Sequence, residues 1–217
     1  TVIADQTLCS GTSAAILTGG AMSGGTGLYT YQWESSNDNI SFASIALATG
    51  ADYNPGVQSS SVYYRRSVSS GVCSGVTSNS VVLVIEPVLT NNTVTGNQTI
   101  CALQTGAQLT GSLPAGGVGV YSYQWESSSD NLNWALLIGE TLQHYIPSNL
   151  SATTYFRRVV NSGVCPAVSS GSVVVEILPQ LLGNVLSADQ TICTGSAPNA
   201  LSGQMPSGGT GSFSYQW

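Results

Sequence analysis

The sequence LYTYQWESS runs from Leu28 to Ser36 and alternates aromatic with polar side chains. In an extended strand Tyr29, Tyr31 and Trp33 lie on one face, and the polar residues between them lie on the other. This alternation is typical of a half-buried strand whose aromatic face packs into a core.

The motif returns as YQWESS at Tyr123–Ser128, and the tryptophans Trp33, Trp125 and Trp217 are spaced by 92 residues. The five cysteines follow the same period, in one series of Cys9, Cys101 and Cys193 and a second series of Cys73 and Cys165. A fixed period of this size indicates repeated domains. We therefore predict repeats over 1–88 and 89–180 and a truncated third repeat over 181–217, in a fragment of a longer repetitive protein.

Apolar alternation with short interruptions rich in Gly, Ser and Asn predicts about seven strands in each repeat and no helix. In the first repeat we expect strands near 2–9, 14–19, 28–35, 41–47, 51–54, 62–69 and 76–86. The fold class is therefore predicted to be all-β.

Charged residues make up only 6% of the chain, and its net charge is −6. The four basic residues are all arginines, too few for a phosphate-binding surface or a polybasic patch. Apolar runs also stay below the roughly 20 residues that span a bilayer. We expect no nucleic-acid partner and no direct membrane insertion in this segment.

The separation of 64 residues between Cys9 and Cys73 recurs between Cys101 and Cys165. We predict that each pair forms an intradomain disulfide, and that the partner of Cys193 lies outside the sequence. Buried free thiols are the alternative, whereas a zinc site is disfavoured because the chain has a single histidine. Disulfides would place the protein in an oxidising compartment.

Adjacent arginines occur at equivalent positions in the two complete repeats, as Arg65 and Arg66 and as Arg157 and Arg158. Neighbours on a strand point to opposite faces, so one arginine is expected at the rim of the core and the other outside. We predict that the outer one pairs across strands with Glu34 in the first repeat and Glu126 in the second. The predicted aromatic core comprises Tyr31, Trp33, Tyr63, Tyr123, Trp125 and Tyr155.

The last strand of the first repeat contains the apolar run Val81–Ile85, and Val173–Val175 occupies the same place in the second. An unbroken apolar run indicates a strand covered on both faces. Either a neighbouring repeat or another copy of the chain could provide this cover.

Several motifs together resemble one known family. They are DQT(L/I)C at Asp5–Cys9 and Asp189–Cys193, GGxG at Gly24–Gly27 and Gly116–Gly119, YQWESS, Y(Y/F)RR, and SGVC at Ser70–Cys73 and Ser162–Cys165. This set resembles the immunoglobulin-like repeats of very large secreted surface proteins of gliding and biofilm-forming bacteria of the Bacteroidetes type. The resemblance covers essentially the whole chain and implies tandem immunoglobulin-like β-sandwich domains, with Tyr63 and Tyr155 as candidates for a tyrosine corner.

The resemblance further implies export by type IX secretion to the extracellular cell surface, as in SprB-type gliding adhesins. Catalysis is not expected, because the single histidine, His144, is replaced by Asp52 in the first repeat. We also expect no cofactor and no metal site.

Three functions remain open. The repeats could form the stalk or fibre of an adhesin, bind glycans or another surface through loop aromatics such as Phe42 and Trp134, or self-associate into a filament. The expected partners are accordingly the neighbouring repeats, with other copies of the chain and surface glycans as further candidates.

Overall fold

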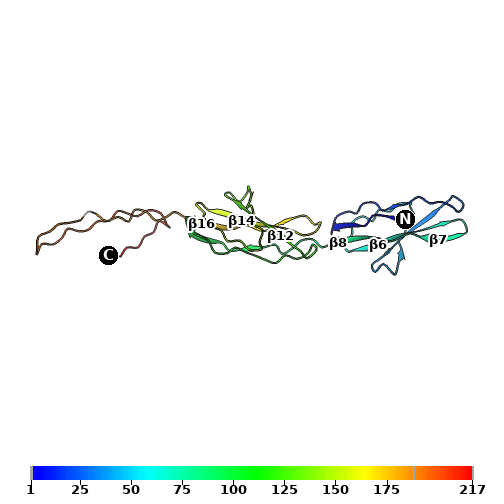
Figure 1. The fold of residues 1–217 in the computed structure, drawn as a ribbon, viewed down its shortest axis with the longest axis horizontal. Coiled ribbons are helices and arrows are strands. Elements are labelled where there is room, and N and C mark those ends of the chain that lie inside the picture. The colour runs from blue at the N-terminus through cyan, green and yellow to red at the C-terminus, as the bar shows by residue number, and fades with distance from the viewer. Residues whose placement is uncertain (1, 188, 217) are drawn as a thin grey trace. The chain divides into compact units, whose positions relative to one another are not determined.

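A computed structural model describes residues 2–187 and 189–216 of the chain, which forms two compact units (Figure 1). The first unit comprises Thr1–Asn92, Leu113–Ser122 and Val160–Val168, and the second comprises Thr93–Ser112, Tyr123–Val159 and Ser169–Trp217. The first unit thus combines the first sequence repeat with three segments of the second repeat, 89–92, 113–122 and 160–168.

The first repeat folds into two β-sheets. Its strands are β1 (Val2–Ile3), β2 (Gln6–Cys9), β3 (Thr18–Gly19), β4 (Thr30–Ser36), β5 (Ala43–Ser44), β6 (Val62–Ser70), β7 (Cys73–Thr77) and β8 (Val81–Glu86). The larger sheet has the order β2-β8-β6-β4-β5, with β7 also paired to β6, and the smaller sheet pairs β1 with β3. Within the larger sheet β2 runs parallel to β8, whereas β6 is antiparallel to β8.

The second repeat has the same arrangement. Its strands are β9 (Val94–Thr95), β10 (Gln98–Cys101), β11 (Thr110–Gly111), β12 (Ser122–Ser128), β13 (Ala135–Leu136), β14 (Thr154–Asn161), β15 (Val168–Ser169) and β16 (Val173–Leu178). The larger sheet has the order β10-β16-β14-β12-β13, and the smaller one pairs β9 with β11. After β16, isolated bridges join Leu182 to Ser207 and Leu186 to Gly203.

The predicted strands differ from the observed ones at several places. The expected strand at 2–9 is divided into β1 and β2, and those at 14–19 and 41–47 are reduced to β3 and β5. The expected strand at 76–86 is divided into β7 and β8, because the Ser78 hydroxyl accepts the Arg66 N–H at 2.9 Å and the Asn79 side chain accepts the Val2 N–H at 2.9 Å. The expected strand at 51–54 contributes only an isolated bridge between Tyr53 and Leu17. Side-chain hydrogen bonds to the backbone therefore replace ladder bonds in these short segments.

Trp33 forms the centre of the first core and is completely buried, as is its counterpart Trp125 in the second. In each core a tyrosine from an isolated bridge lies against the tryptophan, with ring centroids 5.7 Å apart for Trp33 and Tyr53 and 5.5 Å apart for Trp125 and Tyr145. Such contacts between large aromatic side chains are a major source of β-sandwich stability.

All four predicted core tyrosines are only half-buried. Tyr31 and Tyr123 lie on the core face beside Arg66 and Arg158. The predicted core positions of Tyr63 and Tyr155 are wrong, because these two residues lie on the opposite face of their strands. The next residue in each strand fills the core instead, with Tyr64 3% exposed and Phe156 1% exposed. Strand periodicity explains the shift, because Tyr64 lies on the same face of β6 as the buried Arg66.

Within one chain the run Val81–Ile85 is covered on one face only, and cover of its outer face by another copy of the chain stays a prediction. Val81, Leu83 and Ile85 are buried, whereas Val84 is 38% exposed. Burial alternates along β8, as in a strand with one face on the core and the other toward solvent. The outer residues Val82 and Val84 are β-branched, and valine is favoured in strands generally.

Candidate functional site

The most distinctive feature of the first unit is a disulfide between Cys9 and Cys165, which are 156 residues apart in sequence. The predicted pairs Cys9 with Cys73 and Cys101 with Cys165 are therefore wrong. Cys73, Cys101 and Cys193 are free thiols and are exposed. The observed bond joins the first repeat to the hairpin that follows β14 of the second repeat.

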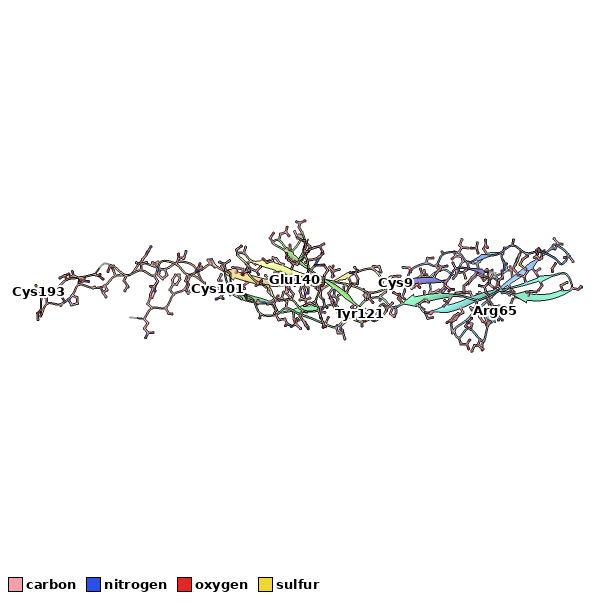
Figure 2. All side chains as sticks on the ribbon, in the orientation of Figure 1. Cys9, Arg65, Cys101, Tyr121, Glu140 and Cys193 are labelled. Atoms are coloured by element: carbon pink, nitrogen blue, oxygen red, sulfur yellow. A yellow bond between two sulfur atoms is a disulfide. The ribbon has the colours of Figure 1, made fainter. Side chains whose placement is uncertain are left out.

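Strand direction explains this pairing. Cys9 lies opposite Glu86 at the end of the parallel pair β2 and β8. Because β6 is antiparallel to β8, the turn that leads from β6 to Cys73 lies at the opposite end of the sheet. Figures 1 and 2 show β7 and Cys9 at these two ends of the first repeat. An intradomain bond between Cys9 and Cys73 is therefore excluded by geometry.

Glu86 holds the hairpin of the second repeat beside the disulfide. Its side chain is almost fully buried, with 7% of the residue exposed, and one carboxylate oxygen accepts the Val164 N–H at 2.8 Å. A side chain at Gly163 would overlap this carboxylate, so the glycine at that position permits the close approach. Gly163 also has a φ of 58°, which favours glycine.

The glycine-rich loop of the second repeat contacts the linker that follows β8. The Gly117 N–H donates to the Pro87 carbonyl at 2.7 Å, and Thr90 and Ala115 exchange two backbone hydrogen bonds. A Cβ at Gly116 would collide with the Val88 carbonyl. The loop therefore shapes the junction between repeats, which gives GGxG a structural role.

The outer arginines form the cross-strand pairs that the sequence indicates. Arg65 Nε lies 2.6 Å from Glu34 Oε2, and Arg157 Nε lies 2.6 Å from Glu126 Oε2. The same guanidinium groups cover aromatic rings on the outer face, with Arg65 Cζ 4.0 Å from the Phe42 centroid and Arg157 Cζ 4.3 Å from the Trp134 centroid. Phe42 and Trp134 are half-buried at this surface.

The inner arginines lie deeper than the expected rim of the core. Arg66 is 1% exposed and Arg158 is fully buried. Arg66 donates to the carbonyls of Gly20 and Ala51, which belong to the opposite side of the sandwich, and its Cζ lies 4.8 Å above the Tyr31 ring. A Cβ at Gly19 would overlap the guanidinium, so a glycine makes room for it.

The second repeat reproduces this buried arginine. Arg158 donates to the carbonyls of Ser112 and Gln143 at 2.8 Å each, and its Cζ lies 4.7 Å above the half-buried Tyr123 ring. Burial lowers the pKa of Arg158, because the charged form loses contact with water. The buried arginines tie the larger sheet of each sandwich to backbone carbonyls on its opposite side. Because backbone carbonyls leave no pattern in the sequence, nothing in it indicated so deep a position.

A tight turn after β4 fixes Asp38. Its carboxylate accepts hydrogen bonds from the Ser36 hydroxyl at 2.7 Å and from the N–H groups of Ile40 and Ser41 at 2.8 Å each. The bond from Ser36, followed by those from the backbone, lowers the pKa of Asp38 to about 2. The carboxylate is thus used as a turn-forming acceptor.

Within residues 2–187 and 189–216, no cluster of three or more His, Cys, Asp or Glu side chains is arranged to hold a metal ion. In the same residues no helix is long and apolar enough to cross a membrane. His144 Nδ1 accepts a hydrogen bond from the Gly111 N–H at 3.3 Å, so its side chain supports the backbone of β11.

The comparisons with known proteins agree with this architecture. A family model described as "Domain of unknown function (DUF8696)" matches residues 1–87 and 90–179. A search of curated protein sequences found no significant match.

Among solved structures, a three-immunoglobulin-domain segment of titin has a TM-score of 0.52 at 13% identity and matches 82% of this chain and 64% of the titin chain. Three N-terminal domains of the highly immunogenic outer capsid protein of bacteriophage RB49 have a TM-score of 0.50 at 12% identity, with 82% of this chain and 68% of that chain covered. The chain thus spans less than two thirds of the titin segment. The predicted fold class of tandem immunoglobulin-like β-sandwich repeats is confirmed, apart from the intradomain disulfides.

Proposed function

The chain belongs to the DUF8696 family, and we propose that its repeats form the non-catalytic stalk or fibre of an extracellular cell-surface adhesin. The observation that carries this proposal is the disulfide between Cys9 and Cys165, which joins consecutive repeats covalently. A covalent bond between repeats is useful in an array that presents another element, and it has no evident use at a catalytic centre.

The redox chemistry supports an extracellular location. Disulfides form and persist in oxidising environments, and the cysteines that form this one are 4% and 7% exposed. Export by type IX secretion, which the sequence motifs imply, belongs to the same proposal. It is tested by whether the parent protein still reaches the surface of cells that lack this export machinery.

Glycan binding is a second candidate function, favoured by one surface feature. On the outer face of the second repeat, Trp134 lies beside Arg157 and Glu126, and the first repeat carries Phe42 beside Arg65 in the same place. Aromatic rings next to hydrogen-bonding groups are a common means of holding sugar rings. A glycan array with the oxidised chain tests this candidate, with Trp134→Ala as the matched variant.

Self-association is the remaining alternative, and the exposed Val84 on β8 is the side chain that could mediate it. Sedimentation equilibrium of the oxidised chain distinguishes it from the stalk. A concentration-independent monomer that binds no glycan supports the stalk. Reversible association that Val84→Glu abolishes would replace the stalk with a filament, and glycan binding lost in Trp134→Ala would replace it with a binding module.

A further inference from the structure

The end of the second repeat reproduces the disulfide-linked junction of the first. Cys101 ends β10 opposite Leu178 of β16, in the same register as Cys9 opposite Glu86. The next backbone group is also placed alike, because the Ala102 N–H donates to the Leu178 carbonyl at 3.0 Å and the Ser10 N–H donates to the Glu86 carbonyl at 2.8 Å. The strand ends of the two repeats are therefore equivalent.

The linker and the glycine-rich loop are equivalent as well. The Gly209 N–H donates to the Pro179 carbonyl at 2.8 Å, as Gly117 donates to Pro87 at 2.7 Å. The bridge between Leu182 and Ser207 matches the one between Thr90 and Ala115. The linker and the glycine-rich loop of the third repeat are thus placed against the second repeat in the same way as those of the second repeat are placed against the first.

The two places differ in their cover and in one side chain, because Leu178 stands where Glu86 does and cannot accept a hydrogen bond from the hairpin. Cys9 is 4% exposed and Leu89 is 7% exposed in the first unit. Their counterparts in the second unit are open, with Cys101 exposed and Leu181 62% exposed. In the first unit the hairpin Ser162–Cys165 lies at this place, where the Ser162 hydroxyl accepts the Val118 N–H at 3.0 Å and Cys165 bonds to Cys9.

A cavity of about 880 Å³ lies at the uncovered place in the second unit. Its lining includes Cys101, Leu178, Gly209 and Thr210. These residues are the counterparts of Cys9, Glu86, Gly117 and Val118, each of which lies against the hairpin in the first unit. Figure 2 shows that Cys101 and Cys193 lie on different segments, so Cys193 does not occupy this position.

We propose that this cavity is the docking site for the Ser-Gly-Val-Cys hairpin of a completed third repeat, and that Cys101 forms a second inter-repeat disulfide with its cysteine. The hairpin is assigned to the third repeat because the loop Gly208–Gly211 of that repeat is already in place. In the first unit, the loop and the hairpin likewise come from one repeat. The bond depends only on the chemistry of the junction and forms whichever proposed function is correct.

Formation of the bond requires an oxidant, for which we assign a small disulfide such as oxidised glutathione. One protein thiolate attacks the small disulfide and releases one glutathione thiolate. The second protein thiolate then attacks the mixed disulfide and releases the other. Two protein thiols are oxidised to one disulfide, and one oxidised glutathione is reduced to two thiols. The exposure of Cys101 gives the oxidant access to the sulfur.

The test extends the full chain by a second copy of Glu126–Gln180 placed after Trp217, which completes the third repeat. After oxidation with glutathione, free thiols are alkylated and disulfide-linked peptides are identified by mass spectrometry. We expect a link between Cys101 and the appended copy of Cys165, while Cys73 and Cys193 are alkylated. In the chain without the extension, Cys101 is alkylated.

Two matched variants of the extended chain sharpen the result. Cys101→Ser should make the appended cysteine fully reactive with the alkylating agent, whereas Cys193→Ser should leave the link to Cys101 unchanged. Tryptophan fluorescence checks that both variants are folded. A bond between Cys193 and the appended cysteine would overturn the proposal, and so would dimers in which Cys101 is linked to Cys73 of another copy.

Discussion

The interior of a repeat and the junction between repeats are encoded differently. The interior recurs with the same contacts, since Trp33 and Arg66 have their counterparts in Trp125 and Arg158 with equivalent partners. The junction does not recur in full, because Cys9 is bonded and Cys101 is free. A single repeat therefore contains all that its core needs, whereas the junction requires side chains from two repeats.

Removal of the junction disulfide should give the largest effect. Cys9→Ser opens a loop of 156 residues, and the chain-entropy treatment gives a loss on the order of 5 kcal/mol in the free energy of unfolding. Denaturant titration, followed by the fluorescence of the buried Trp33, measures it. Cys73→Ser is the control and should change little. Equal losses in both variants would show that the bond forms within a repeat.

The buried arginine should give the next largest effect. Arg66→Met leaves the carbonyls of Gly20 and Ala51 without their donor, and the loss of two hydrogen bonds from a charged group should cost roughly 3 kcal/mol. The same substitution at Arg65 removes only a partly exposed ion pair and should cost below about 1 kcal/mol. If thermal unfolding shows that Arg66→Met and Arg65→Met lose equal stability, then the hydrogen bonds of Arg66 do not stabilise the interior.

At high pH the two repeats should lose stability through different tyrosines, since burial also raises the pKa of Tyr145 in the second repeat. Burial raises the pKa of Tyr64 to about 12, whereas Phe156 has no titrating group at the equivalent position. A raised pKa means that the neutral form of Tyr64 is favoured in the folded state. The contribution of Tyr64 to the free energy of unfolding is therefore complete below pH 10 and is lost as the pH rises through 12.

We therefore expect alkaline destabilisation of the first repeat on the order of 2 kcal/mol, as measured by denaturant titration at pH 9 and above pH 12. Tyr64→Phe should reduce it. An unchanged alkaline loss in this variant would mean that Tyr64 does not cause it.

The outer ion pair should give the smallest effect. Glu34→Arg alone should destabilise the first repeat, and adding Arg65→Glu should restore stability, with a coupling energy of roughly 0.2 to 1 kcal/mol. A double-mutant cycle measures this coupling. Strict additivity of the two substitutions would contradict a role for the pair in strand register.

What could be predicted from the sequence follows the same division between interior and junction. Strand alternation was sufficient to predict the burial of Trp33 and the opposite faces of Arg65 and Arg66, because these features depend only on one strand and its partner. Cysteine spacing was not sufficient, because a separation of 64 within a repeat and one of 156 across repeats are equally periodic.

Strand direction was the signal that could have separated the two cysteine pairings. Because β2 is paired parallel to β8, both strands finish at the same end of the sheet. The hairpin that precedes β8 must then lie at the opposite end. The depth of Arg66 could not be predicted in this way, because its acceptors are backbone carbonyls of distant loops.

The bond between Cys9 and Cys165 also determines which part of the chain can bear tension. When the chain is pulled at its two ends, the force passes from Cys9 directly to Cys165 through the sulfur atoms. Residues 10–164, which include both buried tryptophans, lie outside this path. Their unfolding cannot lengthen the chain, and about 500 Å of extension at roughly 3.5 Å per residue is withheld until the disulfide is reduced.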